Sequence, residues 1–239
     1  MTIPDWQSRT GLLLGKEAVR KLNNSNILVV GLGGVGAYTT EMLCRAGIGR
    51  LTIADGDTVH SSNINRQLIA TKNSLGAQKA EVMANRLSEI NPGIELNVKA
   101  EFLQKENMGA LMEISYDYVV DAIDTLSPKV SLITEAIKKA YPLVSSMGAG
   151  GKTDPLQVKA VDISETYNCR LAYSLRKALH RHGIRTGFKV VFSPEKVSKE
   201  SIQLTDNEQF KRSVVGTVSY MPAIFGCIMA SVVIRDLIK

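Results

Sequence analysis

The sequence predicts an α/β fold, a doubly wound Rossmann-like parallel sheet with a short C-terminal extension. In the first half of the chain, short apolar runs alternate with helical patterns, which is typical of βαβ units. A glycine-rich turn, Gly31–Gly36, directly follows the first apolar run and opens a helix. With 239 residues, 44% of them hydrophobic, the chain is long enough for one large domain with a substantial core.

The elements around the glycine turn follow one another without long loops. Asn26–Val30 is a short apolar run that fits a buried strand. Ala37–Ala46 follows the turn as a helix, and Gly47 ends it. Arg50–Ala54 forms the second strand, which Asp55 closes.

The middle of the chain continues the alternation of helix and strand. Between Gly76 and Ile90, apolar residues recur every three or four positions, which predicts a helix that ends at Asn91-Pro92-Gly93. Ile94–Val98 alternates as a strand does. The next expected elements are a strand at Tyr116–Ile123, a helix at Pro128–Ala140 and a strand at Leu143–Ser145.

The C-terminal part is expected to complete the fold. We predict a core of residues 1–150 and a C-terminal region of residues 151–239 with a basic stretch at 170–192. The expected elements are strands at Gln157–Val161 and Lys189–Phe192, a mobile loop at Ser193–Arg212 and a last helix at Ala223–Leu237. The longest apolar stretch, Met221–Ile234, is shorter than the ~20 residues of a membrane span, so we expect a buried helix.

Charge and cysteine content narrow the class of protein. Lys and Arg number 29 against 23 Asp and Glu, giving a net charge of +6 that suggests a phosphate-bearing partner. The three cysteines lie far apart and form no C-x-x-C pair, which argues against structural zinc and for a reducing compartment. We therefore expect a cytoplasmic protein with no membrane span.

The glycine turn predicts nucleotide binding. Glycines let the backbone turn tightly and approach a phosphate, whose charge is favoured at a helix N-terminus. Asp55 lies nineteen residues past Gly36, where a carboxylate accepts hydrogen bonds from ribose hydroxyls. A tight turn with nothing bound is the alternative, and the same pattern serves NAD and FAD enzymes.

Polar residues after the second strand favour a triphosphate. Hydride transfer needs no cation beside a dinucleotide, whereas attack at phosphorus concentrates charge that Arg, Lys or a metal must offset. Asn63, Arg66 and Lys79 are suitable donors, although Arg66 and Lys79 are alternatively solvated surface cations. Asp124, just past the fourth strand, reaches the crevice better than Asp121 and is a candidate ligand for Mg²⁺. Capping of the next helix is its alternative role.

These motifs together resemble the adenylating domain of the ubiquitin-activating-enzyme-like superfamily, the ThiF/MoeB type. The resemblance rests on Gly31-x-Gly33-Gly34-x-Gly36, Asp55-x-Asp57, Ser62-Asn63-x-Asn65-Arg66-Gln67, Lys79 and Asp121-x-x-Asp124. It implies that the four glycines, Asp55, Asp57, Asn63, Arg66, Gln67 and Lys79 bind ATP, and that Asp124 holds Mg²⁺. It also implies that Arg9 reaches the ATP of a neighbouring subunit in a homodimer, and that Arg9, Arg66, Lys79 and Asp124 serve catalysis.

Further segments resemble one branch, the tRNA threonylcarbamoyladenosine dehydratase family. These are Gly76–Met83, Tyr116–Asp124 and Gly148–Pro155. The resemblance implies ATP-dependent cyclisation of the threonylcarbamoyl group on the adenosine beside the anticodon. Adenylation of a ubiquitin-like sulfur-carrier protein is the alternative, but the lack of paired zinc cysteines argues against it. A non-catalytic partner subunit is a third hypothesis, but the presence of Arg66, Lys79 and Asp124 argues against it.

The expected chemistry needs no enzymic nucleophile. A carboxylate activated as an acyl-adenylate has AMP as its leaving group, and a tethered carbamoyl group closes the ring at high effective molarity. The sequence leaves AMP or ADP as the product open, as well as a role for Cys169 or a sulfur-relay partner. The turn Met147–Gly151 lines the cleft or binds a monovalent cation, K⁺ or Na⁺, unless it is a plain crossover.

The basic stretch is the expected tRNA-binding surface. It holds six cations and no acidic residue between Arg170 and Phe192, which accounts for the whole net charge of +6. A run of this kind is usually a solvated helix face, but a tRNA substrate makes phosphate contacts the better interpretation. The expected tRNA-binding residues are Arg170, Arg176, Lys177, Arg181 and Arg185.

Overall fold

The computed structural model describes residues 3–103, 105–208 and 211–239. Seven strands form its central sheet: β1 Asn26–Val30, β2 Arg50–Ala54, β3 Glu95–Lys99, β4 Tyr118–Asp121, β5 Leu143–Ser146, β6 Lys159–Asp162 and β7 Lys189–Phe192. Their order is β3-β2-β1-β4-β5-β7-β6, and only β6 runs antiparallel to its neighbour. The order reverses between β1 and β4, so the predicted doubly wound sheet is confirmed.

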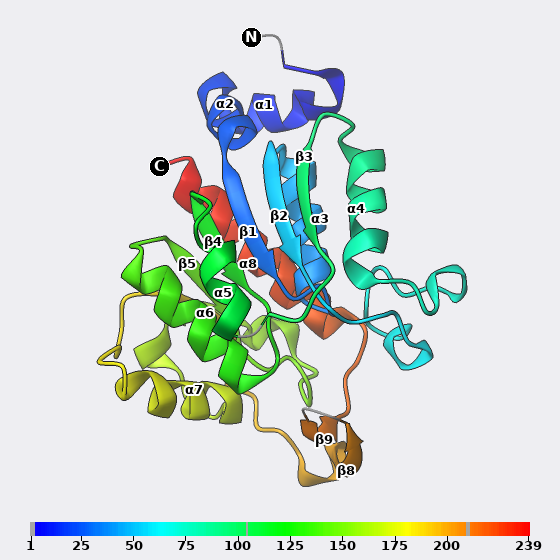
Figure 1. Cartoon of the computed structure of the whole chain (residues 1–239), viewed down its shortest axis with the longest axis vertical. Helices are drawn as coiled ribbons and strands as arrows, with labels where there is room; N and C mark the ends of the chain where they lie inside the picture. The colour runs from blue at the N-terminus through cyan, green and yellow to red at the C-terminus, as the bar shows by residue number, and fades with distance from the viewer. Residues whose placement is uncertain (1–2, 104, 209–210) are drawn as a thin grey trace.

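Helices cover both faces of this sheet (Figure 1). They are α1 Ser8–Leu14, α2 Lys16–Asn24, α3 Gly36–Ala46, α4 Lys79–Ile90, α5 Lys105–Leu111, α6 Leu126–Lys138, α7 Arg170–His180 and α8 Tyr220–Leu237. One core joins the sheet to α3, α4 and α8, and a second core joins it to α5, α6 and α7. Ile27 and Val29 of β1 enter the first core, whereas Leu28 enters the second, as the alternation of a strand requires. Burial on both faces explains why the residues Ile27–Val30 of β1 are all apolar.

Several element boundaries differ from the sequence expectations. The helix expected from Gly76 begins at Lys79, and the strand expected to reach Ile123 ends at Asp121. The last helix begins at Tyr220, before the expected Ala223. Helices α1, α2 and α5 were not expected. Two of them, α1 and α5, are only seven residues long and so carry little periodic signal.

The expectation of a mobile loop over Ser193–Arg212 is wrong. Two strands, β8 Ile202–Glu208 and β9 Lys211–Val215, pair antiparallel in this part of the chain. Backbone hydrogen bonds hold such a ribbon, so it needs no continuous apolar face and leaves little period-two signal in the sequence. The residues between the two strands lie outside the described ranges.

Helix α8 is buried against the rest of the protein. Its 18 residues are long and apolar enough to span a membrane by length and composition, a test that core helices also pass. Eight of its residues are buried. A Cβ at Gly226 would lie 2.6 Å from the carbonyl oxygen of Val35, so α8 and α3 are in close contact. The expectation of a buried C-terminal helix is confirmed, and Cys227 lies on the exposed side of α8.

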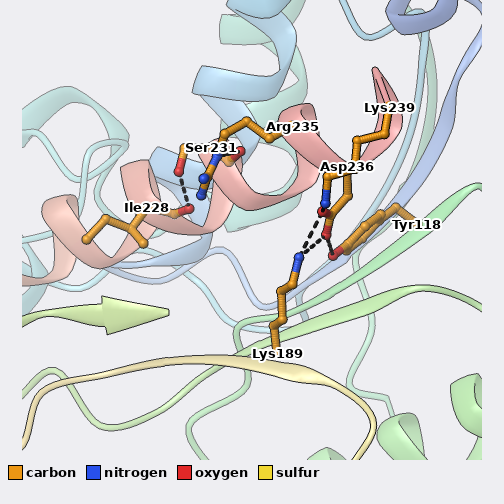
Figure 2. A network of polar contacts seen from close by, with 7 residues as sticks. All are labelled: Tyr118, Lys189, Ile228, Ser231, Arg235, Asp236 and Lys239. Atoms are coloured by element: carbon orange, nitrogen blue, oxygen red, sulfur yellow. Dashed lines mark hydrogen bonds and ion pairs between the residues drawn. The ribbon is translucent and has the colours of Figure 1, made fainter. Parts of the chain in front are cut away.

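A polar network fastens the C-terminal end of α8 to the sheet (Figure 2). The Asp236 carboxylate accepts hydrogen bonds from the Tyr118 hydroxyl at 3.0 Å, from Lys189 Nζ at 2.6 and 2.8 Å, and from Lys239 Nζ at 2.7 Å. Burial alone would raise the pKa of Asp236, but these donors outweigh it and lower the pKa to about 2. Lys189 of the basic stretch is therefore engaged in the fold.

Candidate active site at the carboxyl edge of the sheet

The glycine turn is built by close backbone contacts. Gly31 has φ +89° and donates its N–H to the carbonyl of Ala54 at 2.8 Å. A Cβ at Gly31 would lie 2.7 Å from the Ala122 carbonyl oxygen, and one at Gly36 would overlap the Gly31 carbonyl oxygen. A Cβ at Gly33 would instead make an ordinary contact of 3.7 Å with Gln67 Nε2. The N-terminus of α3 follows at once and suits a phosphate.

Asp55 is fixed to the glycine turn at the end of β2. Its Oδ2 accepts the Leu32 N–H at 2.6 Å, and its Oδ1 accepts the Asp57 N–H at 2.8 Å. Burial raises the pKa of the Asp55 carboxyl, while the charge of Lys79 and the two N–H donors oppose the rise. The predicted ribose ligand therefore sits rigidly beside the turn.

Lys79 is a buried cation and not a solvated one. Its Nζ lies 2.9 Å from Asp57 Oδ2, and its side chain is 5% exposed against 49% for Asp57. The Lys79 N–H also bonds the Asp57 carbonyl at 3.0 Å, so the first residue of α4 is tied to the Asp55–Asp57 segment. The geometry contradicts the alternative that Lys79 is a surface residue.

The segment from His60 to Gln67 brings further donors beside the turn. Asn63 is buried, and its Oδ1 accepts the His60 N–H at 3.1 Å. Half-buried Arg66 donates through Nη1 to the Ser62 carbonyl at 2.7 Å and has its own carbonyl oxygen 3.3 Å from a Cβ at Gly34. Buried Gln67 has its Nε2 nearest Gly33, and its Oε1 has no partner within the described residues. A buried amide oxygen without a partner favours a missing ligand at this position.

The two aspartates after β4 have different surroundings. Asp121 is fully buried, and its Oδ2 contacts Lys129 Nζ and Ser145 Oγ, each at 2.6 Å. Its Oδ1 accepts the Ile123 N–H at 3.1 Å, which fixes the chain leading to Asp124. Asp124 is exposed beyond the strand, and the N-cap of α6 is Thr125. Of the two carboxylates after β4, Asp124 is therefore the accessible one.

Lys129 is a residue that the sequence analysis missed. It is spaced four and seven residues before Ile133 and Ala136, which are buried residues of α6. That spacing places Lys129 on the buried face of the helix, so a lysine there signals a buried anionic partner. The sequence therefore contains a usable signal: a lysine on the buried face of a helix, eight residues after Asp121.

The start of α8 and the segment before it cover the same edge. Thr217 accepts a hydrogen bond from Asn65 Nδ2 at 3.0 Å, and Gly216 accepts the Gly151 N–H at 2.7 Å. A Cβ at Gly34 would lie 2.9 Å from Pro222 Cβ. Residues 215–222 thus connect the glycine turn, the Asn63–Gln67 segment and the turn at Met147–Gly151.

Lys152, just past that turn, is a second buried lysine that the sequence analysis missed. Its side chain donates to the Glu195 carbonyl. Burial lowers the pKa of Lys152, while its neighbours Cys169 and Glu195 oppose the change. Cys169 is itself buried as the N-cap residue of α7. The N-terminus of α7 therefore lies beside the chain that follows β5.

Arg9 lies apart from the other predicted site residues. It is exposed on α1, which with α2 lies at the opposite end of the sheet from the glycine turn (Figure 1). Gln7, next to this helix, bonds Asn23 at the end of α2, just before β1 begins. Within one chain Arg9 does not join Arg66 and Lys79, so only a second copy could bring it to the site.

The basic stretch divides into exposed and engaged cations. Arg170, Lys177, Arg181 and Arg185 are exposed. Arg176 is half-buried, and its guanidinium donates to the carbonyl and hydroxyl of Thr166. Arg176 thus holds the turn before α7, which makes it less suited to a phosphate contact than its neighbours.

The glycine turn, the fixed aspartate and the cations beside them, on a doubly wound sheet, define a nucleotide-binding α/β protein. The chain belongs to the ThiF family, whose model matches residues 7–239. It is 37% identical to the tRNA threonylcarbamoyladenosine dehydratase of Bacillus subtilis, over 97% of this chain and 94% of that protein.

Solved structures agree with this relationship. The crystal structure of E. coli tRNA N6-threonylcarbamoyladenosine dehydratase, TcdA, in complex with ATP matches with a TM-score of 0.89 and 34% identity. The match covers 99% of this chain and 97% of that chain. The AMP complex of TcdA matches over the same shares with a TM-score of 0.88 and 34% identity. The resemblance seen in the sequence is confirmed.

Proposed function

We propose that this protein catalyses the ATP-dependent dehydration of N6-threonylcarbamoyladenosine in tRNA. Buried Lys79, held by Asp57 beside the glycine turn, is the observation that carries the proposal. A cation kept out of water in this way suits a triphosphate more than a dinucleotide. The match over nearly the full length of dehydratase relatives favours this reaction over adenylation of a sulfur-carrier protein.

The reaction removes one water from the substrate. A carboxylate oxygen of the threonyl group attacks the α-phosphorus of ATP, and the bond to pyrophosphate breaks. The tethered carbamoyl group then attacks the acyl carbon, and AMP leaves with the carboxylate oxygen. Because the attacking group is tethered, ring closure has a high effective molarity and needs no thiol of the enzyme. AMP as product is part of this proposal.

The residues at the sheet edge suit this chemistry. The backbone of the glycine turn at Gly33 and the N-terminus of α3 would receive phosphate oxygens, and Asp55 would hold the ribose. Asn63, Arg66, Gln67 and Lys79 would contact the nucleotide, and the unpartnered Gln67 Oε1 fits a ligand there. Asp57 positions Lys79 and so acts through it.

Asp124 is the proposed ligand of a divalent cation. Mg²⁺ typically takes one or two carboxylates together with phosphate oxygens, and Asp124 is an exposed carboxylate at the correct edge. Bound there, Mg²⁺ would offset phosphate charge. The carbonyls of the turn Met147–Gly151 are the proposed ligands of a monovalent cation, K⁺ or Na⁺.

Assembly and tRNA contacts complete the proposal. A homodimer would let Arg9 of one copy serve the ATP of the other, since α1, which carries Arg9, lies at the opposite end of the sheet from the glycine turn. The exposed cations of the basic stretch, Arg170, Lys177, Arg181 and Arg185, would contact tRNA phosphates. A sulfur-relay partner and a cytoplasmic location are further parts of this proposal.

The test is incubation with ATP, Mg²⁺ and tRNA that carries threonylcarbamoyladenosine, followed by mass spectrometry of the nucleosides. We expect loss of one water with the wild type and with the exposed-lysine control Lys72→Met. Lys79→Met should lower kcat/KM by at least about a hundredfold, as loss of a charge-stabilising donor typically does. Unchanged tRNA with the wild type, or full activity of Lys79→Met, would overturn the proposal.

A further inference from the structure

The exposed face of α7 combines cations with an aromatic ring. Arg170, Tyr173 and Lys177 are spaced three and four residues apart, so they lie on one side of the helix. Tyr173 is 63% exposed, and both cations are exposed. The opposite side carries the buried Ala172, Leu175 and Leu179, so this face is free of the core. We name Arg170, Tyr173 and Lys177 the α7 face.

The N-terminal end of α7, which begins at Arg170, lies at the same edge of the sheet as the candidate active site. Tyr167, just before the helix, packs edge-on against Phe192, the last residue of β7, with ring centroids 5.7 Å apart. The N-cap residue Cys169 is a neighbour of Lys152, which follows β5. β7, whose end Tyr167 contacts, is three strand positions from β1, which corresponds to ~15 Å between these two strands across the sheet.

The chemistry of the α7 face fits a single-stranded nucleic acid. A wholly electrostatic surface would need only cations, whereas an exposed aromatic ring between two cations offers a flat surface for a base. No acidic residue occurs between Arg170 and Phe192, so the charge of this stretch is complementary to phosphate. Bases in RNA loops are splayed out and stack on aromatic side chains, which bases inside a duplex cannot do.

We infer that Tyr173 stacks on an unpaired base of the anticodon loop, while Arg170 and Lys177 contact the flanking phosphates. The inference rests on the proposed function and deepens it, because the target adenosine lies beside the anticodon. The α7 face would then hold the loop while the modified nucleoside enters the site at the glycine turn.

The experiment measures binding of two labelled RNAs by fluorescence anisotropy over a range of salt concentrations. One is an anticodon stem-loop carrying threonylcarbamoyladenosine, and the other is a fully paired RNA of equal length. Tyr173→Ala should weaken stem-loop binding by roughly tenfold to a hundredfold, without changing its salt dependence or duplex binding. Tyr173→Phe keeps the ring and should bind as the wild type does. Lys177→Ala should weaken both RNAs and reduce the salt slope by about one.

Wild-type stem-loop affinity in Tyr173→Ala would overturn the inference, as would an equal loss on both RNAs. Circular dichroism and ATP binding of each variant check that the fold is intact. Dehydration by the wild type, measured separately, distinguishes the two proposals. If the wild type dehydrates tRNA and Tyr173→Ala binds normally, only the stacking role fails. If the wild type does not dehydrate tRNA, the proposed function fails and the inference fails with it.

Discussion

The ammonium of Lys129 lies 2.6 Å from Asp121 Oδ2, and both side chains are fully buried beneath the site. Ser145 Oγ donates to the same oxygen at 2.6 Å, so β4, α6 and β5 meet at this carboxylate. The other oxygen of Asp121 accepts the Ile123 N–H at 3.1 Å and orients the chain toward Asp124. The buried pair thus supports the edge where the proposed Mg²⁺ ligand lies.

Removing Lys129 should strongly destabilise the protein. Lys129→Met leaves Asp121 as an uncompensated buried charge, which typically costs about 3–5 kcal/mol of the free energy of unfolding. The double variant Asp121→Asn with Lys129→Met removes both charges and should recover part of that loss. Urea denaturation measures both. Lys138→Met, an exposed lysine of α6, is the control and should stay within about 0.5 kcal/mol of the wild type. Equal stability of Lys129→Met and this control would contradict the account.

Replacing Asp55 should weaken ATP binding and change how the free energy of unfolding depends on pH. Because the pKa of Asp55 is raised in the folded state, that state binds a proton more tightly than the unfolded chain does. The contribution of Asp55 to stability therefore falls as the pH rises from its ordinary value of 3.8 through the raised pKa. We expect the free energy of unfolding of the wild type minus that of Asp55→Asn to be smaller at pH 7 than at pH 4. Calorimetry should show weakened ATP binding by the variant. A difference that grows with pH would contradict this assignment.

Asp236 should have the opposite pH dependence. Its pKa of about 2 lies below its ordinary value of 3.8, so its stabilising effect is present above pH 4 and is lost as the pH falls toward 2. With the side chain 20% exposed and Lys189 45% exposed, we expect Asp236→Asn to cost about 1–2 kcal/mol at pH 7. Urea unfolding at pH 7 and pH 3 measures the cost, which should shrink at the lower pH. A cost independent of pH would show that the charge of Asp236 does not matter.

The cations of the basic stretch should fall into two groups. Arg170→Ala with Lys177→Ala and Arg181→Ala should raise the KM for tRNA and leave the KM for ATP unchanged, since these side chains are exposed. Arg176→Ala should mainly lower the melting temperature, because it removes the hydrogen bonds to Thr166. Steady-state kinetics and thermal unfolding separate the two effects. An unchanged KM for tRNA in the triple variant would show that these cations do not bind tRNA.

The inner strands of the sheet could be predicted from the sequence because they are buried on both faces and so are largely apolar, whereas the edge strands β3 and β6 are only partly buried. The glycine turn and Asp55 were predictable for a similar reason, since their spacing is imposed by the backbone geometry of a strand, a turn and a helix. Burial of Lys79 was not, because its partner Asp57 lies 22 residues away in the chain. The β8–β9 ribbon could not be predicted because backbone pairing imposes no period on its side chains. The structural role of Arg176 could not be predicted either, because its hydrogen-bond partner Thr166 lies outside the helix.

In the proposed reaction, a carboxylate of the substrate is activated at the α-phosphorus of ATP. This step can be followed with tRNA whose threonylcarbamoyl carboxylate carries ¹⁸O, by mass spectrometry of the nucleoside and of the nucleotide products. We expect the nucleoside to lose one water and one ¹⁸O to appear in AMP. Label in inorganic phosphate together with ADP, or no loss of water from the nucleoside, would contradict it.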